Sequence, residues 1–171
     1  MRTPGRANAA SEIVIRPASR ADAALLVEFI HKLAEYERQA DLVSITEHDI
    51  LRDGFGLEPK FWAFIAECGG RAAGYALYFF TYATWYGRQI LFVEDIFILE
   101  EFRRRGLATA LIRELARIAL ARDCYGLVWE VLEWNQPARA AYKAWGANML
   151  TELRVMHLPP EAARKLTKKT Q

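Results

Sequence analysis

Three consecutive arginines and a glycine, Arg103 to Gly106, separate a long apolar stretch from a run with helical spacing. The first N–H groups of a helix have no intrahelical acceptor, and the positive end of the helix dipole lies at its N-terminus. Glycine lets a ligand approach the backbone closely, and arginines add charged, forked donors. The junction therefore predicts a diphosphate site. A plain turn with solvated arginines is the competing interpretation, which the flanking strand and helix disfavour. Because the pattern is neither GxGxxG nor GxxxxGK[ST], nicotinamide dinucleotides and ordinary nucleoside triphosphates are disfavoured.

An acidic pair, Glu94 and Asp95, interrupts the apolar stretch 89–99. A desolvated carboxylate has a raised pKa and can act as a general base. Since side chains alternate along a strand, we expect the two carboxylates to point to opposite faces, so that at most one faces a substrate. The other interpretation is a bulge or an edge at which both polar side chains reach water.

Hydrophobic spacing and capping residues predict the elements that position these groups. In chain order we first expect a strand over 12–16, a helix from Ser19 to about Glu37 or Arg38, and a short helix from Thr46 to 54–56. A hairpin of strands 61–67 and 72–80, a strand over 89–99, and a helix over 106–122 with Leu107, Leu111, Leu115 and Ala119 on its core face should follow. The remaining expected elements are a strand over 126–134, a helix of about ten residues capped by Asn135, and short strands over 148–151 and 153–158.

A hairpin followed by strand–helix–strand units predicts an α/β fold of the three-layer α+β type, with helices on both faces of a sheet. The 171 residues suit one domain. We expect a flexible leader over 1–11, a single domain over 12–160 and a basic tail over 161–171.

Composition narrows the function classes. Hydrophobic residues make up 53% and charged residues 26%, which is ordinary for a globular chain, and the formal net charge is only +2. That balance disfavours a nucleic-acid module. No apolar run is long enough to predict a membrane span or a signal peptide. The two cysteines and three histidines have no ligand spacing, so we expect no metal, and a cytoplasmic protein.

Several segments, taken in order, resemble the GCN5-related N-acetyltransferase (GNAT) superfamily, and in particular its spermidine/spermine and thialysine N-acetyltransferase branch. The similarity covers residues 13 to about 150. It is carried by IRPAS (15–19), LAEYE (33–37), DGFG (53–56), YFFTY (78–82), VEDIFIL (93–99), the Arg-x-x-Gly-x-Ala turn, and EWNQPARAAYKAWGA (133–147). The resemblance implies a central mixed, mostly antiparallel sheet flanked by helices, acetyl-CoA as co-substrate, and a homodimer, as relatives in this branch form.

The resemblance also implies roles for individual residues. Glu94 would take the amine proton as general base, and Tyr142 would act as general acid. The implied cofactor-binding residues are Ile96, Phe97, Ile98, Arg103, Arg104, Arg105, Gly106, Leu107, Ala108, Thr109 and Asn135. The implied substrate-side residues are Tyr36, Glu37, Trp85 and Glu94. The residues themselves allow plainer explanations: Asn135 is already a helix cap, and Tyr142 would suit a packed helix face.

The chain departs from the polyamine enzymes at Ala83, where they typically carry an aspartate near a cationic substrate. We therefore expect a small primary amine, with a lysine analogue or amino acid ahead of a diamine or polyamine. The expected activity is transfer of acetyl from acetyl-CoA by direct attack in a ternary complex. The alternative is a non-catalytic CoA-binding regulatory domain, which the joint presence of Glu94, Asn135 and Tyr142 disfavours.

Overall fold

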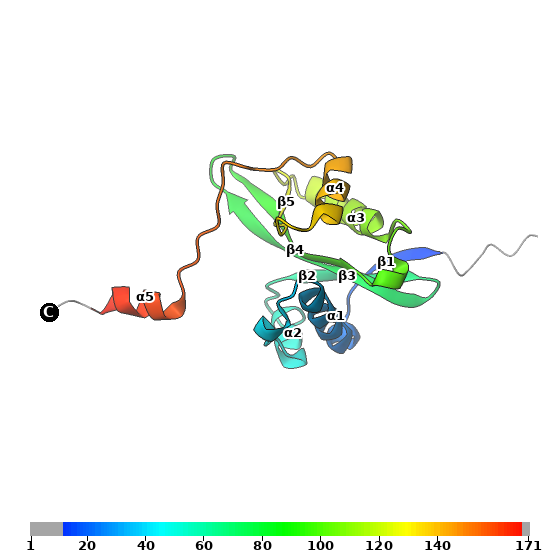
Figure 1. The fold of residues 1–171 in the computed structure, drawn as a ribbon, viewed down its shortest axis with the longest axis horizontal. Coiled ribbons are helices and arrows are strands. Elements are labelled where there is room, and N and C mark those ends of the chain that lie inside the picture. Colours follow the sequence, from blue (N-terminus) through cyan, green and yellow to red (C-terminus); the bar gives the residue numbers. More distant parts are fainter. Residues whose placement is uncertain (1–11, 169–171) are drawn as a thin grey trace, which may run out of the picture. The chain divides into compact units, whose positions relative to one another are not determined.

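The computed structural model describes residues 12–168, so the expected leader over 1–11 lies outside the described residues. The chain forms two compact units, which meet in sequence at Glu130 and Val131. The first holds a five-stranded sheet in the order β1-β2-β3-β4-β5 (Figure 1). The second holds two helices. Each unit is described by itself.

The sheet is mixed and mostly antiparallel, as the sequence predicted, because only the β4–β5 pair is parallel. Its strands are β1 (Ile13–Pro17), β2 (Trp62–Cys68), β3 (Arg71–Ala83), β4 (Arg88–Ile98) and β5 (Leu127–Trp129). The predicted hairpin is β2–β3, and its turn requires glycine because Gly69 and Gly70 have φ of 59° and 74°.

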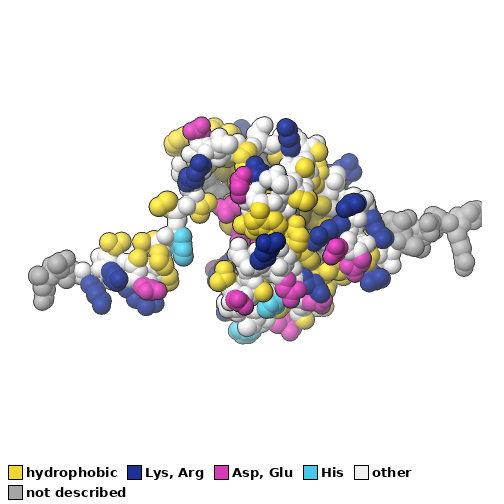
Figure 2. Space-filling model, viewed as in Figure 1, with side chains coloured by type: hydrophobic (Ala, Val, Ile, Leu, Met, Phe, Trp, Pro, Cys, Tyr) yellow, Lys and Arg dark blue, Asp and Glu magenta, His cyan; other side chains and the backbone are white. Residues whose placement is uncertain are grey.

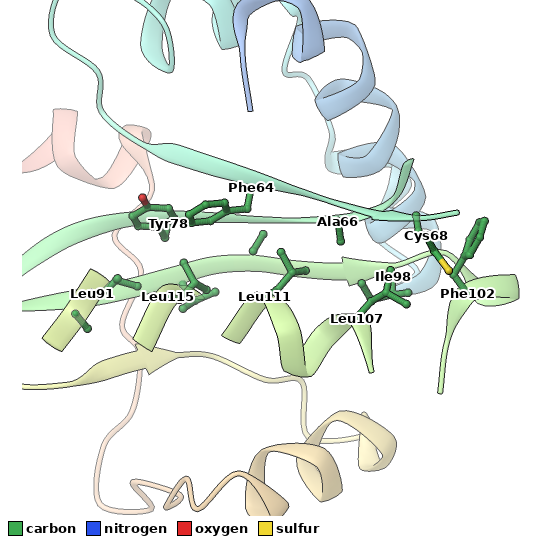
Figure 3. Packing of buried hydrophobic residues seen from close by; sticks show 14 residues of the cluster. Phe64, Ala66, Cys68, Tyr78, Leu91, Ile98, Phe102, Leu107, Leu111 and Leu115 are labelled. Atoms are coloured by element: carbon green, nitrogen blue, oxygen red, sulfur yellow. The ribbon is translucent and has the colours of Figure 1, made fainter. Parts of the chain in front are cut away.

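Helices cover both faces of this sheet, which confirms the three-layer expectation (Figure 1). One face packs against α1 (Ala23–Tyr36) and α2 (Glu47–Asp53), the other against α3 (Leu107–Ala121). The predicted core positions Leu107, Leu111, Leu115 and Ala119 are all buried. Figure 3 shows the three leucines directed toward the sheet beside Phe64, Ala66 and Tyr78.

A charged network fixes the start of α1. A 3-10 turn, η2 (Arg20–Asp22), precedes the helix and carries the capping box that Ser19 predicted. The buried Asp22 accepts hydrogen bonds from the Arg16 guanidinium at 2.8 and 2.9 Å. Arg16 also donates to Glu67 on β2 at 2.7 Å. The guanidinium holds the pKa of Asp22 well below its usual range, so the pair stays ionised and links β1, β2 and α1.

Two further 3-10 turns complete the first unit: η3 (Ala40–Leu42) after α1 and η4 (Glu100–Phe102) after β4. The second unit contains α4 (Gln136–Ala144), capped by Asn135 as predicted, and α5 (Pro160–Thr167). Figure 2 shows hydrophobic and basic side chains exposed on α5. Among the helices that residues 12–168 form, none combines the length and apolar character needed to cross a bilayer.

Four predicted segments differ from the structure. The strand predicted over 126–134 is only Leu127–Trp129. The short strands expected over 148–151 and 153–158 are wrong, because these residues form no strand. A strand needs a partner for its backbone groups, and the described part of the second unit offers none. The expected tail over 161–171 includes most of α5, which begins with a proline in its first turn.

Candidate functional site

The turn between β4 and α3 has the backbone conformation that only glycine adopts readily. Gly106 is the N-cap of α3 and has φ of 90°, while Arg104 before it also has a positive φ of 61°. A Cβ built on Gly106 meets nothing nearer than Ile13 Cδ1 at 3.9 Å. The glycine is therefore needed for its φ, and the space beside the first turn of α3 is open to a ligand.

The three arginines of this turn do different things. Arg104 and Arg105 are exposed beside the N-terminus of α3, and the Arg105 guanidinium lies 5.5 Å from the ring centroid of Phe102. Arg103 instead turns inward. Its Nε donates to the Ile98 carbonyl at 3.0 Å, and its guanidinium lies over the ring of Tyr36. The structure thus leaves two arginines at the helix terminus and commits the third to the ends of β4 and α1.

β4 has an open edge where it approaches this turn. β5 pairs with β4 only from Leu91 to Val93 and ends at Trp129. Beyond Val93, within the residues that the structure describes, the β5-facing edge of β4 has no strand partner. The predicted cofactor-side residues Ile96, Phe97 and Ile98 lie on this segment, so its backbone groups can meet an extended ligand.

Glu94 occupies a bulge in β4. Val93 pairs with Tyr78 and Asp95 pairs with Leu77, so Glu94 is the extra residue between them. Val93 packs in the core on the α3 face, whereas Asp95 bonds to Tyr75 in the core on the α1 face. Residues two apart would share a face in a regular strand. Regular alternation therefore fails here, and the bulge that the sequence allowed as the other interpretation is present.

The Asp95 carboxylate accepts a hydrogen bond from a buried phenol on the neighbouring strand, β3. Tyr75 Oη donates to Asp95 Oδ2 at 2.8 Å, and Tyr75 is completely buried. Burial raises the pKa of Asp95 to about 6; the Tyr75 hydrogen bond opposes this rise, and the negative charges of Glu94 and Glu37 add to it. Burial, together with the charge of Asp95, raises the Tyr75 pKa well above 10. The phenol therefore remains a donor.

Two more carboxylates near this pair have raised pKa values. Although Glu94 reaches solvent, partial burial and the negative charge of Glu130 raise its pKa. Glu37, the C-cap of α1, also has its pKa raised by burial. Its charge acts on both Asp95 and Tyr75. The first unit thus brings the predicted substrate-side Glu37 and the predicted base Glu94 into one acidic group with Asp95.

The structure does not bring Trp85 to this group. Trp85 lies in the turn between β3 and β4 and is 93% exposed. Glu94 lies six positions along β4 from Arg88, the first residue of the strand, which corresponds to about 20 Å. Beside the turn, Tyr86 stacks on Tyr125 with ring centroids 3.7 Å apart.

Asn135 and Tyr142 belong to the second unit. The buried Asn135 accepts a hydrogen bond from Ala138 N at 3.3 Å, which caps α4. Tyr142 is half-buried on the same helix, and its ring centroid lies 5.4 Å from that of Trp145. Both plainer explanations from the sequence are therefore present, and neither conflicts with ligand contact.

Sequence reasoning missed two features of the site. The aromatic run that contains Tyr75 predicts a core residue, and only its place on the neighbouring strand, two residues before the register partner of Asp95, could have marked it. The inward turn of Arg103 had no signal in a run of three arginines. In the described part of the chain, no cluster of three or more His, Cys, Asp or Glu side chains has an arrangement that could hold a metal ion.

Comparison with known proteins gives a consistent result. Residues 26–147 match the acetyltransferase (GNAT) family. Thialysine N-epsilon-acetyltransferase of Bos taurus is 38% identical over 168 residues, which cover 92% of this chain and 98% of that protein. The enzyme of the same name from Caenorhabditis elegans is 40% identical over 118 residues, covering 68% of this chain and 71% of that protein.

A solved structure supports the fold independently of close sequence similarity. The aminoglycoside N-acetyltransferase AAC(6')-Iy in complex with CoA superposes with a TM-score of 0.70 at 22% identity, covering 88% of this chain and 96% of that one. The family match, the relatives and the shared fold agree: this chain belongs to the GNAT acetyltransferase family and is related to the thialysine N-epsilon-acetyltransferases.

Proposed function

We propose that this protein transfers acetyl from acetyl-CoA to a small primary amine. The observation that carries the proposal is the bulged acidic residue Glu94 at the point where the open edge of β4 begins. This edge leads to the glycine turn and the N-terminus of α3. A base and an extended-ligand site therefore lie on one strand.

The residues at the turn fit a diphosphate-containing co-substrate. The first-turn N–H groups of α3 and the exposed Arg104 and Arg105 supply donors and positive charge. The open edge of β4 would hold the pantetheine arm through backbone hydrogen bonds. Acetyl-CoA bound there supplies an activated thioester, and a backbone N–H of that edge would donate to its carbonyl oxygen.

The amine must lose a proton before it can attack. A primary alkyl amine, with a pKa near 10.4, is almost wholly protonated at neutral pH. Glu94 accepts this proton, and the raised pKa of its carboxyl makes it a stronger base than an ordinary glutamate. The neutral nitrogen then attacks the thioester carbon, the C–S bond breaks, the acetylated nitrogen releases its second proton to solvent, and the departing thiolate takes a proton. We assign that last proton to Tyr142 on the strength of the family resemblance. With both substrates bound at once, positioning supplies much of the rate.

The substrate is proposed to be a lysine analogue or amino acid ahead of a diamine or polyamine. Ala83 at the end of β3 replaces the acidic residue expected of polyamine enzymes. Relatives are named for thialysine, and an L-ornithine N5-acetyltransferase of Arabidopsis thaliana is 31% identical over 96 residues, 56% of this chain. These names concern those proteins, and they support an amino-acid side-chain amine here.

We also propose a homodimer. Exposed apolar side chains follow α4 in the second unit, at Met149, Leu150, Leu153, Val155, Met156 and Leu158. Light scattering of the full chain tests this, and a monomer at micromolar concentration would contradict it.

The activity is tested by thiol release. The full chain is mixed with acetyl-CoA and, separately, with thialysine, lysine, ornithine, 1,4-diaminobutane and spermidine. We expect amine-dependent release, fastest with the amino acids. Binding of CoA without release for any amine would instead indicate a CoA-binding regulatory domain. Spermidine as the best substrate by a wide margin would overturn the substrate assignment.

A further inference from the structure

Tyr75 fixes one oxygen of Asp95 in place. The Tyr75 ring is completely buried and stacks on Phe29 of α1, with centroids 5.8 Å apart and an interplanar angle of 14°. Its hydroxyl donates to Asp95 Oδ2 at 2.8 Å. A phenol clamped between a strand and a helix has little freedom, so the carboxylate that it holds is immobilised as well. The mechanism proposed above gives this pair no role.

The second oxygen of the same carboxylate is available to a ligand. Within residues 12–168, the hydrogen bonds and ion pairs include none to Asp95 Oδ1. The described residues also contain no fully buried side-chain oxygen that lacks a partner. Oδ1 is therefore not completely buried, and the half-buried carboxylate presents there one fixed acceptor that none of the described hydrogen bonds uses.

The charges around Oδ1 select the chemistry of its ligand. Glu94 lies beside it on β4, and Glu37 acts on it from the end of α1. The negative charge of Glu130, which follows β5, acts in turn on Glu94. The guanidinium of Arg103, which donates to Ile98 O and lies over Tyr36 and Phe97 on the same face, keeps its positive charge and offsets only part of the negative charge of these carboxylates. Such surroundings repel a carboxylate and attract an ammonium group.

We propose that Asp95 is a substrate-binding residue, which accepts a hydrogen bond through Oδ1 from the reacting ammonium while Glu94 takes the proton from that nitrogen. Tyr75 is a positioning residue that acts through Asp95. The inference rests on the proposed amine acetylation and adds a division of labour to it. One carboxylate is held still and binds, and its neighbour on the bulge accepts the proton.

The two roles predict different kinetic defects. Asp95→Asn keeps an acceptor for the Tyr75 hydroxyl but removes the charge that holds the ammonium. Tyr75→Phe keeps the ring and removes only the hydroxyl that donates to Asp95 Oδ2. Tyr78→Phe is the matched control, because Tyr78 is a buried phenol on the same strand that packs in the core on the α3 face.

The decisive measurement is the KM for the amine, with the monoamine butylamine and with 1,4-diaminobutane, at saturating acetyl-CoA from pH 5.5 to 8.5. We expect Asp95→Asn to raise the KM of both amines by about 10- to 100-fold, the range for a lost charged hydrogen bond. The KM for acetyl-CoA should change less than about 2-fold, since the change removes no donor from the cofactor side.

The pH profile separates positioning from a general loss of structure. Asp95 ionises near pH 6, so amine affinity of the unaltered protein should fall as the pH drops through 6. Asp95→Asn removes that fall. Because the Tyr75 hydrogen bond lowers the pKa of Asp95, Tyr75→Phe should move the fall to higher pH, whereas Tyr78→Phe should leave it in place.

Three outcomes would overturn the proposal. An unchanged amine KM in Asp95→Asn removes Asp95 from the substrate. A defect confined to the diamine assigns Asp95 to a distal nitrogen. A Tyr75→Phe protein with an unmoved pH profile removes the positioning role of Tyr75.

Calorimetric titration of both amines into the CoA-bound full chain distinguishes this inference from the proposed function. The unaltered protein could bind the amine without releasing thiol, and Asp95→Asn could weaken that binding. This result would refute the proposed activity and support the amine-binding role of Asp95. Thiol release together with equal amine binding in both proteins would support the activity and refute the amine-binding role of Asp95. Absence of amine binding would refute both.

Discussion

The guanidinium of Arg103 lies over the ring of Tyr36, 4.7 Å from its centroid. The same side chain donates to the Ile98 carbonyl at 3.0 Å and lies 6.0 Å from the Phe97 ring centroid. One arginine of the glycine turn thus connects the C-terminal end of α1, which carries Glu37, to the end of β4. The proposed cofactor side and the proposed amine side of the site therefore share this residue.

Removing this connection should affect the amine more than the co-substrate. Arg103→Met loses the cation–π contact and the hydrogen bond to Ile98, so the end of α1 is less firmly placed. We expect the amine KM to rise about 3- to 10-fold, as for a loss of one modest contact, with a smaller change for acetyl-CoA. Arg104→Met should show the opposite pattern. Initial-rate kinetics with each substrate varied in turn provide the test, and an Arg103→Met defect confined to acetyl-CoA would assign that arginine to the anion.

A second prediction concerns the backbone of the turn. Gly106→Ala places a Cβ at φ of 90°, which destabilises the fold by about 1–2 kcal/mol and distorts the first turn of α3. We expect both a lower free energy of unfolding in urea and weaker acetyl-CoA binding. Gly126→Ala is the control, because a Cβ there meets no atom within 4 Å. Equal effects of the two substitutions would show that the special conformation of Gly106 is unimportant.

The elements with strong periodicity were predictable because one face of each is buried in a single core. Helix α3 shows this best: Leu107, Leu111 and Leu115 recur every four residues and all pack on the sheet. The length of β5 was not predictable in this way. Its sequence continues to favour a strand beyond Trp129, but its pairing with β4 stops where the bulge at Glu94 begins.

The same bulge limited the prediction of the site. The acidic pair allowed either regular alternation, with Glu94 and Asp95 on opposite faces, or a bulge, and a pattern of alternating side chains does not decide between them. The sequence did identify the acidic pair and the glycine turn, because charges inside an apolar strand and an arginine-rich helix start are unusual. The partners of these groups, Tyr75 and Tyr36, come from other elements and depend on tertiary packing.

Glu94→Gln should lower turnover by about 100-fold, the range for loss of a general base. The glutamine keeps the shape of the side chain but cannot accept the amine proton. Without a base, the reaction depends on the fraction of free amine, which falls tenfold per pH unit. The defect relative to the unaltered protein should therefore grow as the pH is lowered from 9 to 7. A pH–rate profile parallel to that of the unaltered protein would remove Glu94 from the base role.

Tyr142→Phe tests the proton donor to the thiolate. The substitution keeps the ring that contacts Trp145 and removes only the hydroxyl. Turnover should fall about 10- to 100-fold, with the KM for acetyl-CoA little changed. Tyr125→Phe is a suitable control, since Tyr125 is exposed and stacks on Tyr86. An unaltered turnover number for Tyr142→Phe would give Tyr142 a packing role alone.

Asp95→Asn should make the protein more stable and less active at neutral pH. The pKa of Asp95 is raised from 3.8 to about 6 in the folded protein, mainly by burial. Between these values the folded state binds more protons than the unfolded state, so stability falls as the pH rises through this window. Above pH 6 the folded protein carries the full cost of the buried charge, on the order of 1–2 kcal/mol after solvent screening. The asparagine avoids this cost and still accepts the Tyr75 hydrogen bond.

Urea unfolding should therefore show a higher free energy of unfolding for Asp95→Asn than for the unaltered protein at pH 7.5, and this gain should disappear by pH 4. A loss of stability at pH 7.5 would mean that the charge holds the fold together, whereas the expected gain, together with the raised amine KM, means that it is kept for binding.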